Sequence, residues 1–307
     1  MGVPLVSVII PTYNRWPMVG EAIESVLNQT FRDFELIVVD DGSSDDTLTR
    51  LEKYGPDIQR LAQSKAGVSG ARNHGVSAAR GRYLAFLDSD DLWGRKKLEI
   101  QTLFMTQNAD VEISQTEEIW LRNGIRVNPK ARHRKPSGNI FRESLGLCLV
   151  SPSAVMMTRD LFERIGGFDE SLPVCEDYDL WLRIAVDHRV PLIPLALTVK
   201  RGGHADQLSH SVWGVDRYRV QALQKLLRSG LHGEKRAWAL DALKRKISVL
   251  AQGARKRKKH SEALAYETIL VEFIQEMVNV GGADSRVWPK EGTPSPNLGA
   301  VAEMESV

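Results

Sequence analysis

The chain has 307 residues, of which 42% are hydrophobic and 26% are charged, so it can bury a sizeable core. The net charge is only +2, but residues 216–281 hold 14 Lys and Arg against 7 Asp and Glu, so basic character is confined to one segment. Two cysteines are too few for a disulfide framework, and no apolar run reaches the ~20 residues that cross a bilayer. With no leader-like N-terminus, we expect a cytoplasmic protein without a transmembrane anchor.

Strand and helix patterns alternate along the first part of the chain. A run rich in β-branched residues at 5–10 predicts a strand, and apolar positions spaced three and four apart predict a helix from Pro17 to about Leu27. Further strands, with helices between them, are expected at residues 34–39, 58–62 and 83–87. This alternation predicts an α/β fold with a mostly parallel central sheet and helices on both faces.

Polar residues follow three of these strands, at 12–14, 40–43 and 88–91. Ligands bind beyond the carboxyl ends of the strands in such sheets, so these segments should converge on one site. The three carboxylates of 88–91 would repel one another, and a hard divalent cation would compensate them; an acidic turn that caps a helix is the alternative. The first turn has neither a GxGxxG nor a GxxxxGK[ST] pattern, which disfavours Rossmann dehydrogenases and P-loop enzymes.

The pattern becomes less regular after residue 93. We expect a helix at 98–104, a hairpin at 111–127, a strand at 153–157, a helix at 159–165 and a strand at 191–199. The basic stretch 130–135 is expected to be an exposed loop, with phosphate contact as the alternative. Glu176 and Asp177 begin a helix with one apolar face, where acidic residues can serve the helix dipole alone.

The basic segment predicts two or three amphipathic helices, with the run 255–259 between them. That run fits a solvated turn or a peripheral contact with an anionic membrane at its inner face. A nucleic-acid partner is not expected, because no aromatic residues or known module accompany the run. We therefore expect a catalytic domain at 1–215, a helical extension at 216–281 and a disordered tail at 282–307.

Taken together, several segments resemble the family 2 glycosyltransferases, which use nucleotide sugars and have the GT-A fold. The resemblance covers roughly residues 5–210 and is carried by residues 7–14, 35–43, 67–73, 86–91, 166–169 and 176–181. It implies a GT-A type sheet, a divalent metal, Mn²⁺ or Mg²⁺, and a single displacement that inverts the anomeric configuration.

The resemblance also implies roles for residues on the donor side. The first strand exit would line the base pocket, Asp41 would hydrogen-bond the base, and Asp88 would lie near the ribose. The nucleotide-sugar-binding residues implied in this way are Pro11, Thr12, Tyr13, Asp41, Arg72, Asn73, Asp88 and Ser89.

The remaining implied roles concern the metal and the acceptor. Asp90 would coordinate the metal, and His204 is a second candidate for a metal or phosphate contact. Asp177 would be the general base that takes the proton of the acceptor hydroxyl. Glu176 and Trp181 would lie on the acceptor side.

The function expected from this resemblance is transfer of a sugar, with UDP-sugars favoured, to a hydroxyl of a saccharide or lipid-linked glycan, as in polysaccharide and cell-envelope biosynthesis. A metal-dependent nucleotidyltransferase is the alternative among enzymes, although a basic glycine-rich phosphate loop is missing near the first strand. A catalytically silent sugar-nucleotide-binding protein is the third possibility. Both acidic motifs are intact, which argues against it.

Overall fold

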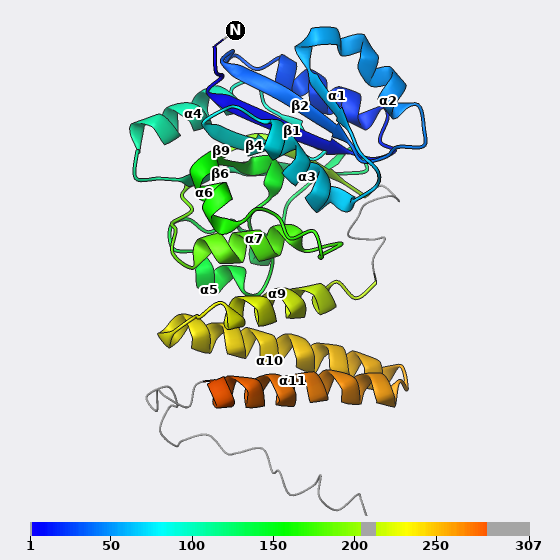
Figure 1. Ribbon diagram of the computed structural model, residues 1–307, viewed down its shortest axis with the longest axis vertical. Helices are drawn as coiled ribbons and strands as arrows, with labels where there is room; N and C mark the ends of the chain where they lie inside the picture. Colours follow the sequence, from blue (N-terminus) through cyan, green and yellow to red (C-terminus); the bar gives the residue numbers. More distant parts are fainter. Residues whose placement is uncertain (1, 204–212, 281–307) are drawn as a thin grey trace, which may run out of the picture.

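The computed structural model describes residues 2–203 and 213–280, with side chains as far as residue 276. Within these residues, nine strands form one sheet, and three long helices are stacked beneath this α/β part (Figure 1). The strand order is β3-β2-β1-β4-β8-β6-β9-β5, with β7 paired to β6. His204 and the expected tail at 282–307 lie outside the described residues.

The first four strands are parallel, as the alternation of strands and helices predicts. They are β1 (Val6–Thr12), β2 (Phe34–Asp40), β3 (Gln59–Ala62) and β4 (Tyr83–Phe86). Strand β1 pairs with both β2 and β4, so that Thr12 lies opposite Asp40 and Ile9 lies opposite Phe86. The carboxyl ends of these strands therefore meet along one edge.

Helices cover both faces of this parallel part, because successive strand residues point to opposite faces. Val8 packs in one hydrophobic cluster with residues of α1 (Met18–Leu27), whereas Ile9 packs in a second with residues of α3 (Gly67–Ala78). Gly75 allows α3 to approach β1, since a Cβ atom there would lie 2.5 Å from Cγ2 of Ile9. Short helices α2 (Thr47–Arg50) and η1 (Leu51–Asp57) connect β2 to β3.

The other half of the sheet is mixed. It contains β5 (Leu92–Trp93), β6 (Ile113–Arg122), β7 (Ile125–Val127), β8 (Val155–Thr158) and β9 (Leu192–Gly202). Strand β8 is antiparallel to β4 and β6, whereas β6 and β9 are parallel. The predicted hairpin is confirmed as β6–β7, and its turn residues Asn123 and Gly124 have the positive φ values that a tight two-residue turn requires.

Along the chain, four α-helices lie between β5 and β9. α4 (Lys97–Gln107) follows β5, and α5 (Phe141–Ser144) is a single turn. α6 (Arg159–Ile165) begins where the Thr158 side chain accepts the Leu161 N–H and ends at Gly166, which has φ 87°. α7 (Glu176–Ala185) begins with the two acidic residues predicted at its start.

The predicted helical extension is confirmed as α9 (Asp216–Arg228), α10 (Gly233–Lys256) and α11 (His260–Val280). In Figure 1, α9 lies directly beneath α7, with α10 and α11 below it. Leu223, Leu243 and Phe273 of these helices belong to the same hydrophobic cluster as Tyr178 of α7. The domain boundary expected at 215/216 stays a prediction, but the two sides of it share one core.

One loop differs from its prediction. Lys135 ends the basic stretch expected to be exposed, yet its side chain is 5% exposed and pairs with Glu118, whose side chain is 4% exposed, at 3.1 Å. The rest of the stretch is mostly exposed. A buried carboxylate overrides the preference of this lysine for solvent. Across the described ranges, no helix is long and apolar enough to span a membrane.

Candidate functional site

The polar exits of β1 and β2 lie side by side, as predicted. The Asp41 N–H donates to the carbonyl of Thr12 at 2.8 Å, which locks the two exits together. Pro11 and Thr12 are buried, whereas Tyr13 is 36% exposed. The ammonium of Lys65 lies 3.7 Å from the centre of the Tyr13 ring. An aromatic ring and a cation are therefore available at this edge.

Asp41 is buried and holds the loop that leads into α3. Its Oδ1 accepts hydrogen bonds from the Gln63 side chain at 2.7 Å and from the Ala66 N–H at 2.8 Å, and its Oδ2 accepts one from the Gly67 N–H at 2.9 Å. These N–H groups begin α3, where a carboxylate is stabilised by the helix dipole. The predicted contact between Asp41 and a base stays a prediction, and any such contact would use the remaining lone pairs.

Arg72 joins the two acidic motifs. Its guanidinium donates to Asp88 Oδ1 and to Glu176 Oε1, each at 2.7 Å, and it lies 4.9 Å from the centre of the Phe168 ring. The side chain is 3% exposed. Although burial lowers the pKa of Arg72, Asp88 and Glu176 raise it above its ordinary value, so the cation is retained. A single buried cation thus fixes the distance between the acidic loop after β4 and the start of α7.

Asn73, the next residue of α3, holds a different loop. Its amide nitrogen donates to the Phe168 carbonyl at 2.9 Å and to Glu170 at 2.8 Å, and its oxygen accepts the Phe168 N–H at 3.1 Å. The amide is engaged with this loop, so the nucleotide contact expected of Asn73 has no support from its surroundings. The glycine-rich segment 166–169 is thereby tied to α3.

The acidic loop after β4 divides its three carboxylates between two tasks. Asp91 is 1% exposed, and its carboxylate accepts from the Ser153 hydroxyl at 2.6 Å and from the Arg201 N–H at 2.9 Å. Asp88 and Asp90 are half-buried at the strand edge, and Asp90 lies 3.6 Å from the Arg15 guanidinium. Asp91 therefore anchors the loop, a role not assigned from the sequence, while the other two face the edge.

Asp177 lies at the start of α7 and is half-buried. Its Oδ1 accepts the Tyr178 N–H at 2.7 Å, and its Oδ2 accepts from the Cys148 thiol at 3.3 Å. Burial and the neighbouring Asp177 raise the pKa of the Cys148 thiol, so it stays protonated as a donor. Cys148 was missed because a lone cysteine in a loop carries no signal in the sequence.

Glu176 differs from its neighbour because it is 5% exposed. Burial and the adjacent Asp177 raise the pKa of Glu176 to about 7, while Arg72 opposes the shift. Its carboxylate is bound to Arg72, so the acceptor contact expected of Glu176 is not supported by its position.

Lys200 of β9 is a further residue that the sequence prediction missed. Its ammonium donates to the Ser151 hydroxyl at 3.3 Å. Burial lowers the pKa of Lys200, but Glu118, Asp91, Asp88 and Asp177 raise it above its ordinary value. Lys200 is thus a cation that acts on the carboxylates of several segments. The one signal in the sequence was that Lys200, a charged residue, follows the apolar strand predicted at 191–199.

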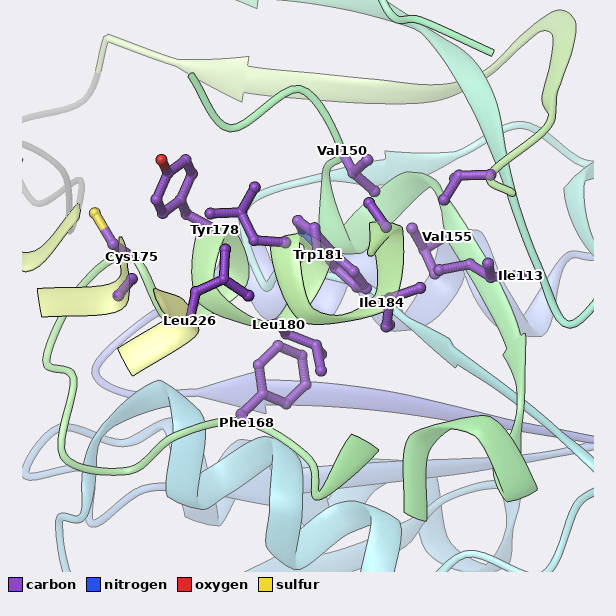
Figure 2. Close-up of a cluster of buried hydrophobic side chains, with 14 of the residues drawn as sticks. Ile113, Val150, Val155, Phe168, Cys175, Tyr178, Leu180, Trp181, Ile184 and Leu226 are labelled. Carbon is purple, nitrogen blue, oxygen red and sulfur yellow. The ribbon is translucent and has the colours of Figure 1, made fainter. Parts of the chain in front are cut away.

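Trp181 requires a correction. It was expected on the acceptor side, but it is 3% exposed and belongs to the hydrophobic cluster beneath α7. Figure 2 shows it beside Val150, Val155 and Ile184. The helical periodicity of α7 turns this side chain into the core, so the acceptor contact expected of Trp181 is not supported by its position.

The carboxylates at the strand edge suit a hard cation. The described ranges contain no group of three or more His, Cys, Asp or Glu side chains placed to enclose a metal. A cation that also binds substrate phosphates needs only one or two protein carboxylates, and Asp90 supplies an oxygen ligand of that kind. The donor set therefore fits Mg²⁺ or Mn²⁺ held jointly with a diphosphate.

Comparison with known proteins agrees with this geometry. Residues 7–166 match the family model for Glycosyl transferase family 2. The chain belongs to this family. Its sheet order and flanking helices are those of the GT-A fold: it superposes with a TM-score of 0.70 on the structure of Staphylococcus aureus TarS 1–349 in complex with UDP-GlcNAc. The two share 22% identity, covering 88% of this chain and 80% of TarS 1–349, so the likeness concerns the fold.

This family 2 chain is also similar in sequence to two curated relatives. An uncharacterized glycosyltransferase of Rickettsia felis is 39% identical over 188 residues, which cover 59% of the chain. The match spans only 30% of the length of that relative. WfgD of Escherichia coli, a UDP-Glc:α-D-GlcNAc-diphosphoundecaprenol β-1,3-glucosyltransferase, is 34% identical over 191 residues, covering 62% of this chain and 73% of WfgD.

Proposed function

We propose that this family 2 chain transfers a sugar from a nucleotide diphosphate sugar, with UDP favoured, to a hydroxyl of a glycan or lipid-linked acceptor, with inversion. The observation that carries the proposal is the position of Arg72. It is bonded at 2.7 Å to both Asp88 and Glu176, so the donor-side loop and the start of α7 are held as one unit. WfgD, which takes glucose from UDP-Glc to a diphosphoundecaprenol-linked GlcNAc, supports the same donor and acceptor classes.

The donor nucleotide would lie over the exits of β1 and β2. Tyr13 offers a partly exposed ring to a base, and Asp41 orients the loop beside it. Asp90 would hold Mn²⁺ or Mg²⁺ together with the diphosphate, with Asp88 near the ribose, and that ion would supply charge stabilisation to the leaving group. Arg15, which lies 3.6 Å from Asp90, adds a positive charge at the same place.

Asp177 would act from the opposite side of the anomeric carbon. It is half-buried, and the Cys148 thiol and the Tyr178 N–H hold its carboxylate in one orientation. A carboxylate held in one orientation can meet the proton of an acceptor hydroxyl in a fixed geometry. With Asp177 as the only base and no covalent nucleophile, the sugar would be transferred in a single displacement, which inverts its anomeric configuration.

A peripheral membrane contact would suit a lipid-linked acceptor. The run 255–259 ends α10 and turns into α11, and Trp213, which is 53% exposed, lies close to Arg257 and Lys259. An exposed indole beside basic residues is typical of surfaces that meet anionic headgroups.

Calorimetry tests the donor half of the proposal. UDP should bind more tightly with Mn²⁺ present in the parent, and Asp90→Asn should lose that dependence. Equal metal dependence of UDP binding in both proteins would show that Asp90 is not a metal ligand. Release of pyrophosphate from a nucleoside triphosphate would favour a nucleotidyltransferase instead, and binding without turnover across a panel of nucleotide sugars and glycan acceptors would favour a silent binding protein.

A further inference from the structure

A cavity of about 300 Å³ lies beside the β6–β7 hairpin, away from the nucleotide edge. The residues that line it include Glu117, Trp120, Pro129, Lys130, His133 and Arg134. It combines one large aromatic side chain with several charged groups, a composition suited to a small polar ligand. From the sequence, phosphate contact was the alternative for the stretch 130–135, whereas Glu117, Trp120 and Pro129 were assigned no role.

The floor of this cavity is rigid. Glu118 and Lys135 form a buried pair at 3.1 Å, and the other carboxylate oxygen of Glu118 accepts the indole N–H of Trp120 at 3.0 Å. The His133 ring packs on this indole with a centroid distance of 5.5 Å. A partly exposed indole fixed by a buried carboxylate can offer its surface to the apolar face of a sugar ring without losing side-chain entropy.

The rim of the cavity is positively charged. Lys130 and Arg134 are exposed, while the charge of Lys135 is matched by Glu118. The pKa of His133 is lowered by burial and then by Arg132, Lys130 and Lys200, so these cations act on the cavity together. Glu117 is the opposing charge on the lining. An anion bound at Lys130 and Arg134 would relieve this repulsion.

The position of the cavity relates it to Asp177. Trp120 pairs with Lys200 across β6 and β9, so their side chains lie on the same face of the sheet. The charges of Glu118, at the floor of the cavity, and of Asp177 both raise the pKa of Lys200, so the same ammonium is within electrostatic reach of both carboxylates. In the sheet, β4 and β8 separate β6 from β1, where a nucleotide would lie. The cavity therefore lies on the Asp177 side of the site, where an acceptor would bind, and not on the nucleotide side.

We propose that this cavity is a subsite for an anionic glycan, with a sugar ring against Trp120 and a phosphate or carboxylate group beside Lys130 and Arg134. This rests on the proposed function only in identifying the glycan as the acceptor. A sugar phosphate and a uronic acid share the chemistry required, and the experiment separates them.

The test follows the indole N–H signal of Trp120 by NMR, identified by its loss in Trp120→Phe. The probes are glucose 1-phosphate, methyl β-glucuronide, neutral methyl β-glucoside and inorganic phosphate. Titration of the signal should give at least one of the charged sugars a ~10-fold or higher affinity than the neutral sugar. The charged sugar that binds more tightly identifies the anion as a phosphate or a carboxylate. Lys130→Ser/Arg134→Ser should abolish that difference, whereas Arg126→Ser, on exposed β7, should keep it.

Three results would overturn the subsite: no shift with any sugar, equal shifts with charged and neutral sugars, or a shift with inorganic phosphate as strong as with glucose 1-phosphate. UDP affinity with Mn²⁺ is measured on the same proteins. It should be unchanged in Lys130→Ser/Arg134→Ser, and its loss there would also count against a separate subsite. Failure of UDP binding in the parent would contradict the proposed function alone, since the sugar shifts do not depend on it.

Discussion

At the scale of single residues, two adjacent carboxylates at the start of α7 have different environments. Asp177 is half-buried and accepts two hydrogen bonds, whereas Glu176 is buried against Arg72. Adjacent helix positions point about 100° apart, so the Glu176 carboxylate meets Arg72 of α3 and the Asp177 carboxylate meets Cys148. This separation suggests that binding and proton transfer depend on different residues.

Asp177→Asn should separate turnover from binding. Asn retains the size and most hydrogen bonds of Asp but cannot accept the proton, so we expect kcat to fall by roughly 10² or more with UDP affinity nearly unchanged. Turnover, UDP calorimetry and melting temperature should be measured together, with Asp110→Asn, whose side chain is 70% exposed, as the matched control. Near-normal turnover of Asp177→Asn would exclude a general-base role.

The pKa of Glu176 predicts a pH dependence. Burial and Asp177 raise this pKa to about 7, so as the pH falls through about 7 Glu176 takes up a proton and its ion pair with Arg72 is lost. We expect kcat/KM to fall on the acid side in that range, as a property of the Glu176–Asp177 pair. In Glu176→Gln the fall of kcat/KM on the acid side should move to another pH or disappear. The maximum kcat/KM of this variant should also be lower than that of the parent. A limb that is identical in both proteins would assign the titration to another group.

At the scale of elements, the position of α3 depends on how closely it approaches β1. A Cβ atom on Gly75 would lie 2.5 Å from Ile9 and 3.1 Å from Val39, and both contacts are made by methyl groups in a packed core. Since α3 carries Arg72, its displacement would also disturb the link between the two acidic motifs.

Gly75→Ala should therefore destabilise the protein by about 1–3 kcal/mol, the usual cost of overpacking. Urea unfolding measures this cost, and Gly146→Ala, at an exposed position whose nearest contact is 4.0 Å away, is the control. Adding Ile9→Val to Gly75→Ala should recover part of the loss. If Gly75→Ala were as stable as its control, α3 and β1 would not be in close contact.

The turn between α10 and α11 allows a second prediction at this scale. Replacing residues 255–259 by serine should weaken binding to anionic vesicles at low salt, measured by sedimentation, by more than ~10-fold, because each basic residue near such a surface contributes about 1 kcal/mol. Arg50→Ser/Lys53→Ser, in the exposed α2–η1 segment, provides a control at a distant surface. Equal sedimentation of all three proteins would identify the run as a solvated turn.

At the scale of the whole molecule, the hydrophobic cluster beneath α7 continues into the C-terminal helices. Leu223 and Leu226 of α9 are buried with Tyr178 and Leu180 of α7 (Figure 2 includes Leu226). The helix that carries Glu176 and Asp177 is therefore packed between the sheet and the extension. We expect the extension to stabilise the donor site, in addition to making any membrane contact.

Leu223→Ala tests this coupling. The residue is 0% exposed, so the substitution should lower the free energy of unfolding by about 2–5 kcal/mol. The protein should still unfold in a single thermal transition, with a lower melting temperature both with and without UDP. Leu264→Ala, at a residue that is 64% exposed on α11, should change stability by less than ~0.5 kcal/mol. Two separate transitions in Leu223→Ala, with only one shifted by UDP, would instead indicate an independent extension.

The sequence alone determined the order of elements and the edge at which they meet. Strand periodicity and polar strand exits placed residues 12–14, 40–43 and 88–91 together, because parallel strands with crossover helices present their carboxyl ends at one edge. Local signals also gave the bounds of α6 and the β6–β7 turn, since a capping threonine, a left-handed glycine and an Asn-Gly pair act within a few residues.

Only the tertiary structure decided which side chains face the site. Trp181 and Asn73 match family motifs, yet Trp181 packs in the core and Asn73 binds a loop. Lys200, Cys148 and Lys135 have no motif, and their roles arise from carboxylates contributed by distant segments. Side-chain direction and charge partners depend on long-range packing, which a local pattern does not encode.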